Sequence, residues 1–170
     1  MKSININQEG FTLIELLIVI AIIAILASTV FVSLDPLTRF RDARDSARWS
    51  GVSTLINAIK IDQIDNGGSY NPEITALTKG TVYMIGTDTT GCDDAYDAGK
   101  CDAIVLGDTD CVNLTKLVDE GYVGSIPISP NGVGTWTAGK VGYTLMASSS
   151  GLIYIQACES ENTTNILLSR

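Results

Sequence analysis

The stretch FTLIELLIVIAIIAILASTVFVSL, residues 11–34, decides how the rest of this sequence is interpreted. Glu15 is its only charged residue, and most of its other side chains are Ile, Leu, Val or Ala. A helix of this length, at about 1.5 Å per residue, spans the roughly 30 Å hydrocarbon core of a bilayer. Lipid offers the backbone no hydrogen bonds, so a helix is the expected conformation. We therefore expect residues 11–34 to form a membrane-spanning helix.

A cleaved secretory signal peptide is the alternative interpretation of this segment. Such a peptide has an apolar core of about 7–15 residues behind a positively charged region. Here the apolar run is longer, and Lys2 is the only basic residue ahead of it. Ala27-Ser28 has the small residues that such a cleavage site needs, so this alternative stays open.

Glu15 is the most informative residue of the apolar run. An unpaired carboxylate in an apolar environment costs several kcal/mol, so its presence needs an explanation. In one interpretation Glu15 lies at the membrane interface and stays in contact with water. In the other it meets a cation within the membrane or within an assembly.

The residues around Glu15 resemble the processing site of type IV prepilins and pseudopilins. Gly10-Phe11-Thr12-Leu13-Ile14-Glu15-Leu16 follows a short polar leader, residues 1–10. The resemblance implies that a prepilin peptidase, which is also an N-methyltransferase, cleaves after Gly10 and methylates the new amino group of Phe11. It also implies that Phe11 and Glu15 direct assembly. In an apolar filament core, the Phe11 ammonium and the Glu15 carboxylate of an adjacent subunit would offset each other's desolvation.

Two features depart from the usual family pattern. Glu9 precedes Gly10, where a basic residue is common, and the apolar run has no proline before Asp35-Pro36. Many family members have a kinking proline earlier, so we expect this helix to bend later, at Pro36.

Residues 35–66 are expected to continue the helix as an amphipathic segment. Val52, Leu55, Ile56 and Ile59 recur at helical spacing, which gives one face that packs against a domain. Gly67-Gly68 then ends the helix.

Four arginines in this segment allow two interpretations. They either contact the acidic heads of neighbouring subunits or form an ordinary solvated helix face: Arg39, Arg41, Arg44 and Arg48. Their charge favours a cytoplasmic location for this end of the span. The cysteines and the family resemblance favour the outside, and we adopt that orientation.

Residues 67–170 are expected to form a globular head with a small antiparallel sheet. The expected strands are 81–85, 103–107, 141–147 and 152–157, and the last two form a hairpin. A short helix is expected at 112–120. This order is similar to the heads of pilins and pseudopilins. The predicted fold is α+β, with a long N-terminal helical spine packed against the sheet.

Four cysteines lie in the C-terminal part of the chain: Cys92, Cys101, Cys111 and Cys158. An even number in an exported, loop-rich region predicts two disulfides. Buried free thiols or a four-sulfur metal site are alternatives, and the absence of any CxxC pair disfavours the metal. Three pairings exist. We choose Cys92–Cys101, which closes an acidic loop, and Cys111–Cys158, which ties the short helix to the last strand.

The charge pattern excludes several functions. The chain has a net charge of −8 and no histidine, which disfavours direct nucleic-acid binding and excludes Ser–His and Cys–His catalysis. Asp93, Asp94 and Asp97 are weak candidates for calcium ligands, but no EF-hand pattern is present. A solvated loop is the main expectation there, and no cofactor is expected.

The resemblance therefore implies a structural role rather than an enzyme. The expected function is a subunit of a homo-oligomeric type IV pilus-like filament that supports adhesion, motility or DNA uptake. Its expected partners are other pilins, the peptidase and an inner-membrane assembly platform. The precursor would span the cytoplasmic membrane once with its head outside, and the mature chain would join an extracellular pilus. The alternatives are a secretion pseudopilin and, from another class, a membrane-anchored exported enzyme or binding module.

Overall fold

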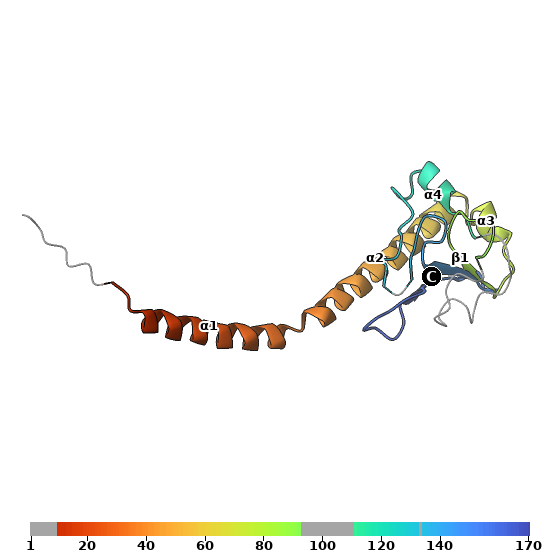
Figure 1. The fold of residues 1–170 in the computed structure, drawn as a ribbon. Coiled ribbons are helices and arrows are strands. Elements are labelled where there is room, and N and C mark those ends of the chain that lie inside the picture. The colour runs from red at the N-terminus through yellow and green to blue at the C-terminus, as the bar shows by residue number, and fades with distance from the viewer. Residues whose placement is uncertain (1–9, 93–110, 133) are drawn as a thin grey trace, which may run out of the picture. The chain divides into compact units, whose positions relative to one another are not determined.

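The computed structural model describes residues 10–92, 111–132 and 134–170 (Figure 1). They fall into two compact units, one that ends at Arg39 and a head unit, Phe40–Arg170. Along the chain the elements run α1, α2, α3, β1, α4, β2, β3 and β4. The predicted α+β class, with a long apolar N-terminal helix and a small antiparallel sheet, is confirmed.

α1 (Leu13–Leu34) ends where the sequence predicts a bend. Asp35 adopts a left-handed backbone, with φ 37° and ψ 71°, and α2 (Pro36–Asp65) begins at the next residue. Proline disfavours the helical conformation at the residue that precedes it, whereas proline itself fits the first position of a helix. The predicted bend at Pro36 is thus a break between two helices.

α2 supplies one wall of the core of the head unit. Val52, Leu55, Ile56 and Ile59 are buried, which confirms the face predicted from helical spacing. They belong to one apolar cluster with residues of the sheet, such as Leu145 and Ile155. The helix stops at Asp65, and Gly67 and Gly68 follow with positive φ, as the glycine pair predicts.

The sheet has four antiparallel strands in the order β1-β2-β3-β4. β1 (Val82–Met84), β2 (Tyr143–Ala147) and β3 (Ile153–Ala157) lie within predicted strands, and β2 and β3 form the predicted hairpin. β4 (Leu167–Ser169) was not predicted. It is three residues long, and only its pairing with β3 makes it a strand. The strand predicted at 103–107 lies outside the described residues.

Two short helices complete the described head. α3 (Pro72–Thr75) was not predicted, and α4 (Thr115–Asp119) lies within the predicted helix 112–120. α4 begins later than predicted because Val112 forms a bridge with Ile85 beside the sheet. The Asn113 side chain then accepts a hydrogen bond of 2.9 Å from the backbone N–H of Thr115.

The disulfide pairing chosen from the sequence is wrong. Cys92 is bonded to Cys111, which excludes both Cys92–Cys101 and Cys111–Cys158. Backbone pairing brings the two sulfurs together, because Cys111 N–H donates to the Asp88 carbonyl oxygen at 3.0 Å. Cys158 is disulfide-bonded too. Cys101 lies outside the described residues.

Candidate assembly site

The predicted cleavage junction lies directly in front of α1. Gly10, Phe11 and Thr12 are outside regular structure, and the Phe11 side chain is 89% exposed. Thr12 is the N-cap of α1 and has an extended backbone. The Gly10–Phe11 bond is therefore in an accessible, non-helical segment, which is where backbones are most readily cleaved.

Glu15 and Thr12 form a capping box at the start of α1. Glu15 Oε2 accepts hydrogen bonds from the Thr12 N–H at 2.9 Å and from Thr12 Oγ1 at 2.7 Å. Thr12 Oγ1 in turn accepts the Glu15 N–H at 3.3 Å. The carboxylate thus lies at a helix N-terminus, where the helix dipole favours negative charge. Sequence reasoning missed the role of Thr12, although Thr-x-x-Glu before an apolar run is the signature of this motif.

The capping box also orients the Glu15 carboxylate. Both bonds from Thr12 reach Oε2, so within the described residues Oε1 has no donor. A free amino group at Phe11 would arise one residue before the cap. The acid and the predicted amine thus belong to the same end of α1, and each helix presents both groups there.

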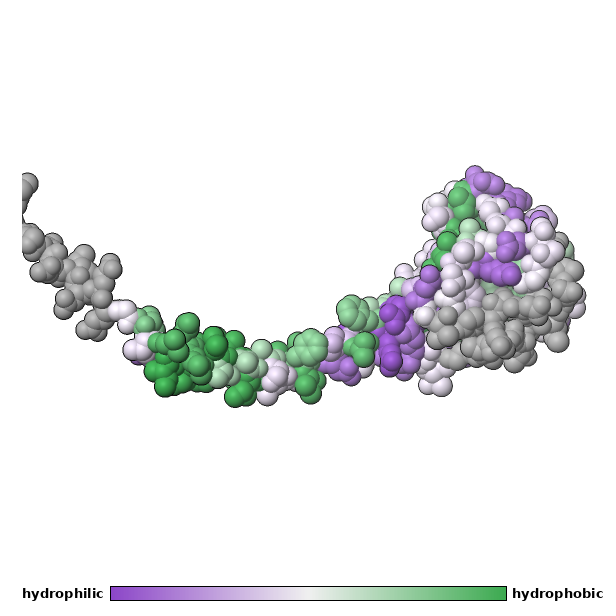
Figure 2. All heavy atoms as spheres, in the orientation of Figure 1, coloured by the Kyte–Doolittle hydropathy of each residue, from purple (hydrophilic) through white to green (hydrophobic). Residues whose placement is uncertain are grey.

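α1 is apolar on all sides. None of its residues is buried within the chain, and its large aliphatic side chains are about half exposed or more. Figure 2 shows this apolar surface along the helix. Among the described helices, one is long and apolar enough to cross a membrane by length and composition. A helix with no polar face must be covered by lipid or by other apolar helices.

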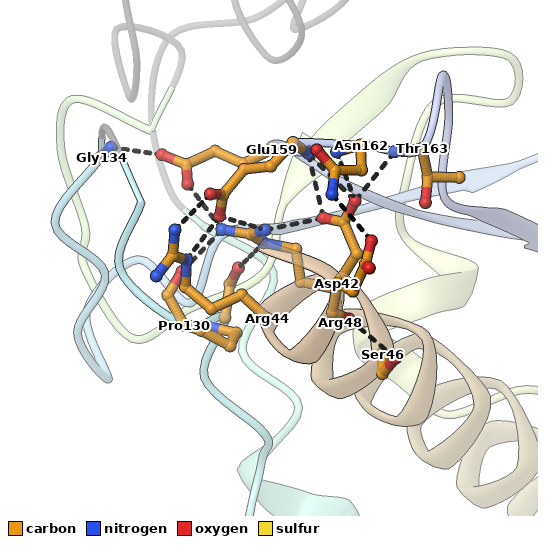
Figure 3. A network of polar contacts seen from close by, with 12 residues as sticks. Asp42, Arg44, Ser46, Arg48, Pro130, Gly134, Glu159, Asn162 and Thr163 are labelled. Carbon is orange, nitrogen blue, oxygen red and sulfur yellow. Dashed lines mark hydrogen bonds and ion pairs between the residues drawn. The ribbon is translucent and has the colours of Figure 1, made fainter. Parts of the chain in front are cut away.

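A second polar site lies in the head unit, around Arg48 (Figure 3). The Arg48 side chain is fully buried and lies on the same face of α2 as Val52 and Leu55. Its Nη1 donates to Asp45 Oδ1 at 2.8 Å and to Glu161 Oε1 at 2.9 Å. A buried guanidinium is stable only with such partners, because its desolvation must be offset.

The remaining donors of Arg48 reach two other segments. Nη2 donates to Glu159 Oε2 at 2.9 Å and to the Pro130 carbonyl oxygen at 3.0 Å, and Nε donates to Ser129 Oγ at 3.3 Å. Glu159 Oε1 also accepts the Gly134 N–H. One side chain therefore joins α2, residues 129–130 and the chain that follows β3.

The side chain of Asp45 binds the backbone of the same C-terminal segment, at residues 161–163. Its carboxylate accepts the N–H groups of Glu161, Asn162 and Thr163 at 2.9–3.1 Å, in addition to Arg48. Burial alone would raise the pKa of Asp45, but these backbone donors and Arg48 outweigh it and lower the pKa to about 2.

Arg44 adds an outer pair to this network. Its guanidinium makes a two-pronged contact with Glu161, with Nε at 2.6 Å from Oε1. The hydrogen bond from Arg44 is the main reason that the pKa of Glu161 is lowered. We call Asp45, Arg44, Arg48, Glu159 and Glu161 the arginine network.

For Arg48, the arginine network corrects both interpretations of the four arginines, contact with neighbouring heads and a solvated helix face. Arg48 is buried and bound by its own chain, so it neither contacts a neighbouring subunit nor forms a solvated face. Arg44 is also engaged with its own chain. Arg39 and Arg41 are exposed, and for them subunit contact stays a prediction.

The acidic loop is not part of the described site. Asp93, Asp94 and Asp97 lie outside the described residues, so calcium binding there stays a prediction. In the described ranges, no group of three or more Cys, Asp or Glu side chains is arranged to hold a metal ion.

Comparison with known proteins gives two matches. The family model of the prokaryotic N-terminal methylation motif matches residues 5–31. Over 71 residues the chain is 44% identical to the type IV wide pilus major component PilA4 of Thermus thermophilus. That match covers 42% of this chain and 52% of PilA4, so the chain spans about half the length of this relative. No solved structure matches the chain. These findings confirm the resemblance predicted from the sequence.

Proposed function

We propose that this chain, which carries the N-terminal methylation motif of prokaryotic pilins, is a structural subunit of a type IV pilus-like filament. The observation that carries the proposal is α1: an apolar helix, exposed on every side, that begins with a capped glutamate directly after Gly10-Phe11. The similarity to a pilus component supports a structural rather than a catalytic role.

The apolar surface of α1 requires two successive environments in this proposal. In the precursor, α1 spans the cytoplasmic membrane with the head outside the cytoplasm. In the filament, the same surface packs against the α1 helices of other subunits. Transfer between the two is feasible because lipid tails and packed aliphatic side chains are similarly apolar. An assembly platform in the inner membrane would carry out this transfer.

Cleavage after Gly10 supplies the polar contact that sets the register. The peptidase releases residues 1–10, and the methylated amino group of Phe11 becomes the new N-terminus. Glu15 Oε1 of one subunit then accepts a hydrogen bond from the Phe11 ammonium group of its neighbour, while Oε2 keeps its hydrogen bonds from Thr12. Without the pair, each group would be buried in the apolar core as an uncompensated charge, at a cost of about 3–5 kcal/mol.

The arginine network would keep the head folded while it is carried on the filament surface. Arg48 and Asp45 bind Glu159 and Asn162, which lie more than 100 residues later in the chain. These bonds hold the C-terminal segment against α2. Functions such as adhesion, motility or DNA uptake would belong to the whole fibre. PilA4 is named as a pilus component, which favours a pilus over the secretion pseudopilin that shares the same N-terminal helix.

Substitution of Glu15 by alanine tests the proposal. In cells that assemble the filament, Glu15→Ala should still insert in the membrane, because its apolar run is unchanged. Its amount in sheared filaments should fall at least tenfold, since a loss of about 3–5 kcal/mol exceeds 1.4 kcal/mol per decade. Glu73→Ala, an exposed glutamate on α3, is the matched control and should assemble normally. Normal assembly of Glu15→Ala would refute the pairing.

A further inference from the structure

An apolar groove runs beside α4 on the head unit. It has a volume of about 380 Å³ and is walled by aliphatic side chains from α4, from the end of β1 and from the chain before β2: Ile85, Leu114, Val118, Ile126, Ile128 and Val141. Ile128 is 45% exposed, although most of its neighbours in the groove belong to the core. Asp119 lies on the groove and is exposed. We call this feature the α4 groove.

A complementary side chain lies on α2. Phe40 is 63% exposed, and Arg41, which follows it, is exposed as well. Phe40 and Arg41 thus place an exposed aromatic ring beside a positive charge. The α4 groove places an apolar surface beside an exposed carboxylate, so the two surfaces are complementary in polarity and in charge. In a precursor, lipid headgroups and acyl chains could contact Phe40. A subunit that has left the membrane has no lipid to cover this ring.

Phe40 does not line the α4 groove of its own chain. α4 is beside the C-terminal end of α2, because Glu120 faces the buried carboxyl of Asp62 there. Along the helix, 22 residues separate Phe40 from Asp62. At 1.5 Å per residue this is about 33 Å. Phe40 is therefore far from α4 itself, and its exposed ring lies outside the groove of its own chain.

We propose that the α4 groove of one subunit receives Phe40 of a second copy of this chain, and that Arg41 of that copy pairs with Asp119. This inference rests on the proposed filament function and names a head contact within it. A contact between two different surfaces of the same molecule is heterologous, so it repeats without closing. Each subunit then offers two different surfaces, its groove and its Phe40, which is the arrangement that an open-ended filament needs.

The proposed contact has an apolar part and a charged part. The ring of Phe40 supplies apolar area in a pocket that is about the size of a small ligand site. Arg41 and Asp119 give the contact its orientation, because opposite charges at the rim of an interface act mainly on specificity. The chain as a whole is acidic, with a net charge of −8, so an exposed arginine is a distinctive contact between copies.

A photocrosslinking experiment tests the proposal directly. The full-length chain carries the phenylalanine analogue p-benzoylphenylalanine at position 40 in cells that assemble the filament, and sheared filaments are irradiated. We expect cross-linked dimers whose peptide joins position 40 of one copy to residues 113–128 of another. The same analogue at Leu152, which is 41% exposed beside the turn between β2 and β3, is the matched control and should not label that peptide.

A charge exchange gives a second measurement that does not depend on the analogue. Arg41→Asp and Asp119→Arg should each lower incorporation into filaments by about two- to fivefold, the range for an exposed ion pair. The double variant should recover at least half of the wild-type level.

The outcomes separate this inference from the proposed function. Cross-links to residues 113–128, or recovery in the double variant, support the contact. Wild-type chain in filaments with position 40 linked elsewhere, to lipid or to another protein, overturns it and leaves the filament function intact. A double variant that assembles no better than the single ones overturns the contact as well. Absence of the wild-type chain from filaments refutes the proposed function itself.

Discussion

Substitution of Arg48 by methionine should destabilise the head far more than the same change at an exposed arginine of α2. Methionine keeps most of the side-chain length but removes all the donors of the guanidinium. Arg48 makes five hydrogen bonds, three of them to carboxylates, and its side chain is fully buried. The change therefore leaves carboxylates in the interior without their cation.

The structure indicates which carboxylate would lose the largest share of its stabilising contacts. Asp45 retains three backbone N–H donors, and Glu161 retains Arg44. Glu159, whose side chain is 6% exposed, retains the Gly134 N–H but loses its cation. Removal of one member of a buried ion pair costs about 3–5 kcal/mol, and we expect Arg48→Met to fall in that range.

Equilibrium unfolding in urea measures this loss. The head unit, Phe40–Arg170, is expressed without the apolar helix, and its disulfides are kept oxidised. Arg48→Met should lower the free energy of unfolding by about 3–5 kcal/mol. Arg41→Met, at an exposed position of the same helix, is the control and should change it by less than about 0.5 kcal/mol. Equal stability of the two variants would refute the structural role of Arg48.

Two further predictions concern the same region of the head. The pKa of Asp45 is lowered to about 2 from 3.8. Its contribution to stability is therefore complete above pH 3.8 and is lost as the pH falls through about 2. The expected loss is about 2 kcal/mol, measurable as urea midpoints between about pH 5 and pH 2, and Asp45→Asn should remove this part of the pH dependence. Gly51→Ala would place a Cβ atom inside van der Waals contact distance of Tyr143 Oη. It should cost about 1–3 kcal/mol in the same assay, whereas Gly124→Ala, with no atom within 4 Å of the new Cβ, should be nearly neutral. A neutral Gly51→Ala would show that the Tyr143 hydroxyl does not lie against Gly51 of α2.

The features that the sequence predicted correctly depend on local patterns. The length of the apolar run predicts α1, and Pro36 predicts the break after it. Helical spacing predicts the buried face of α2, and two strand-forming runs joined by a short Ser-Gly stretch predict the hairpin of β2 and β3. Each of these signals involves residues that are close together in the chain.

The sequence also contains a pattern that indicates the burial of Arg48. Asp45 and Arg48 lie at the same helical spacing as Val52, Leu55 and Ile59, so they continue the buried stripe in the N-terminal direction. Charged residues in register with a buried face indicate internal partners rather than solvent. Which partners they have could not be predicted, because Glu159 is 111 positions away from Arg48.

The disulfide shows the same limit. The pairing was chosen by nearness in sequence and by an expected tie between α4 and the last strand. The actual partner of Cys92 is set by backbone bonds between distant segments, such as Val112 N–H to the Met84 carbonyl oxygen at 2.8 Å. β4 depends in the same way on pairing with β3, since its three residues carry no strand pattern of their own.

Trimming after Gly10 and packing into a filament through α1 are the two events on which the proposed function depends. Intact mass spectrometry of the subunit in filaments purified from cells measures both most directly. We expect a chain that begins at Phe11 and carries one added methyl group at its N-terminus. A filament without this chain, a subunit that retains residues 1–10, or one that begins near Ser28 would contradict the proposal.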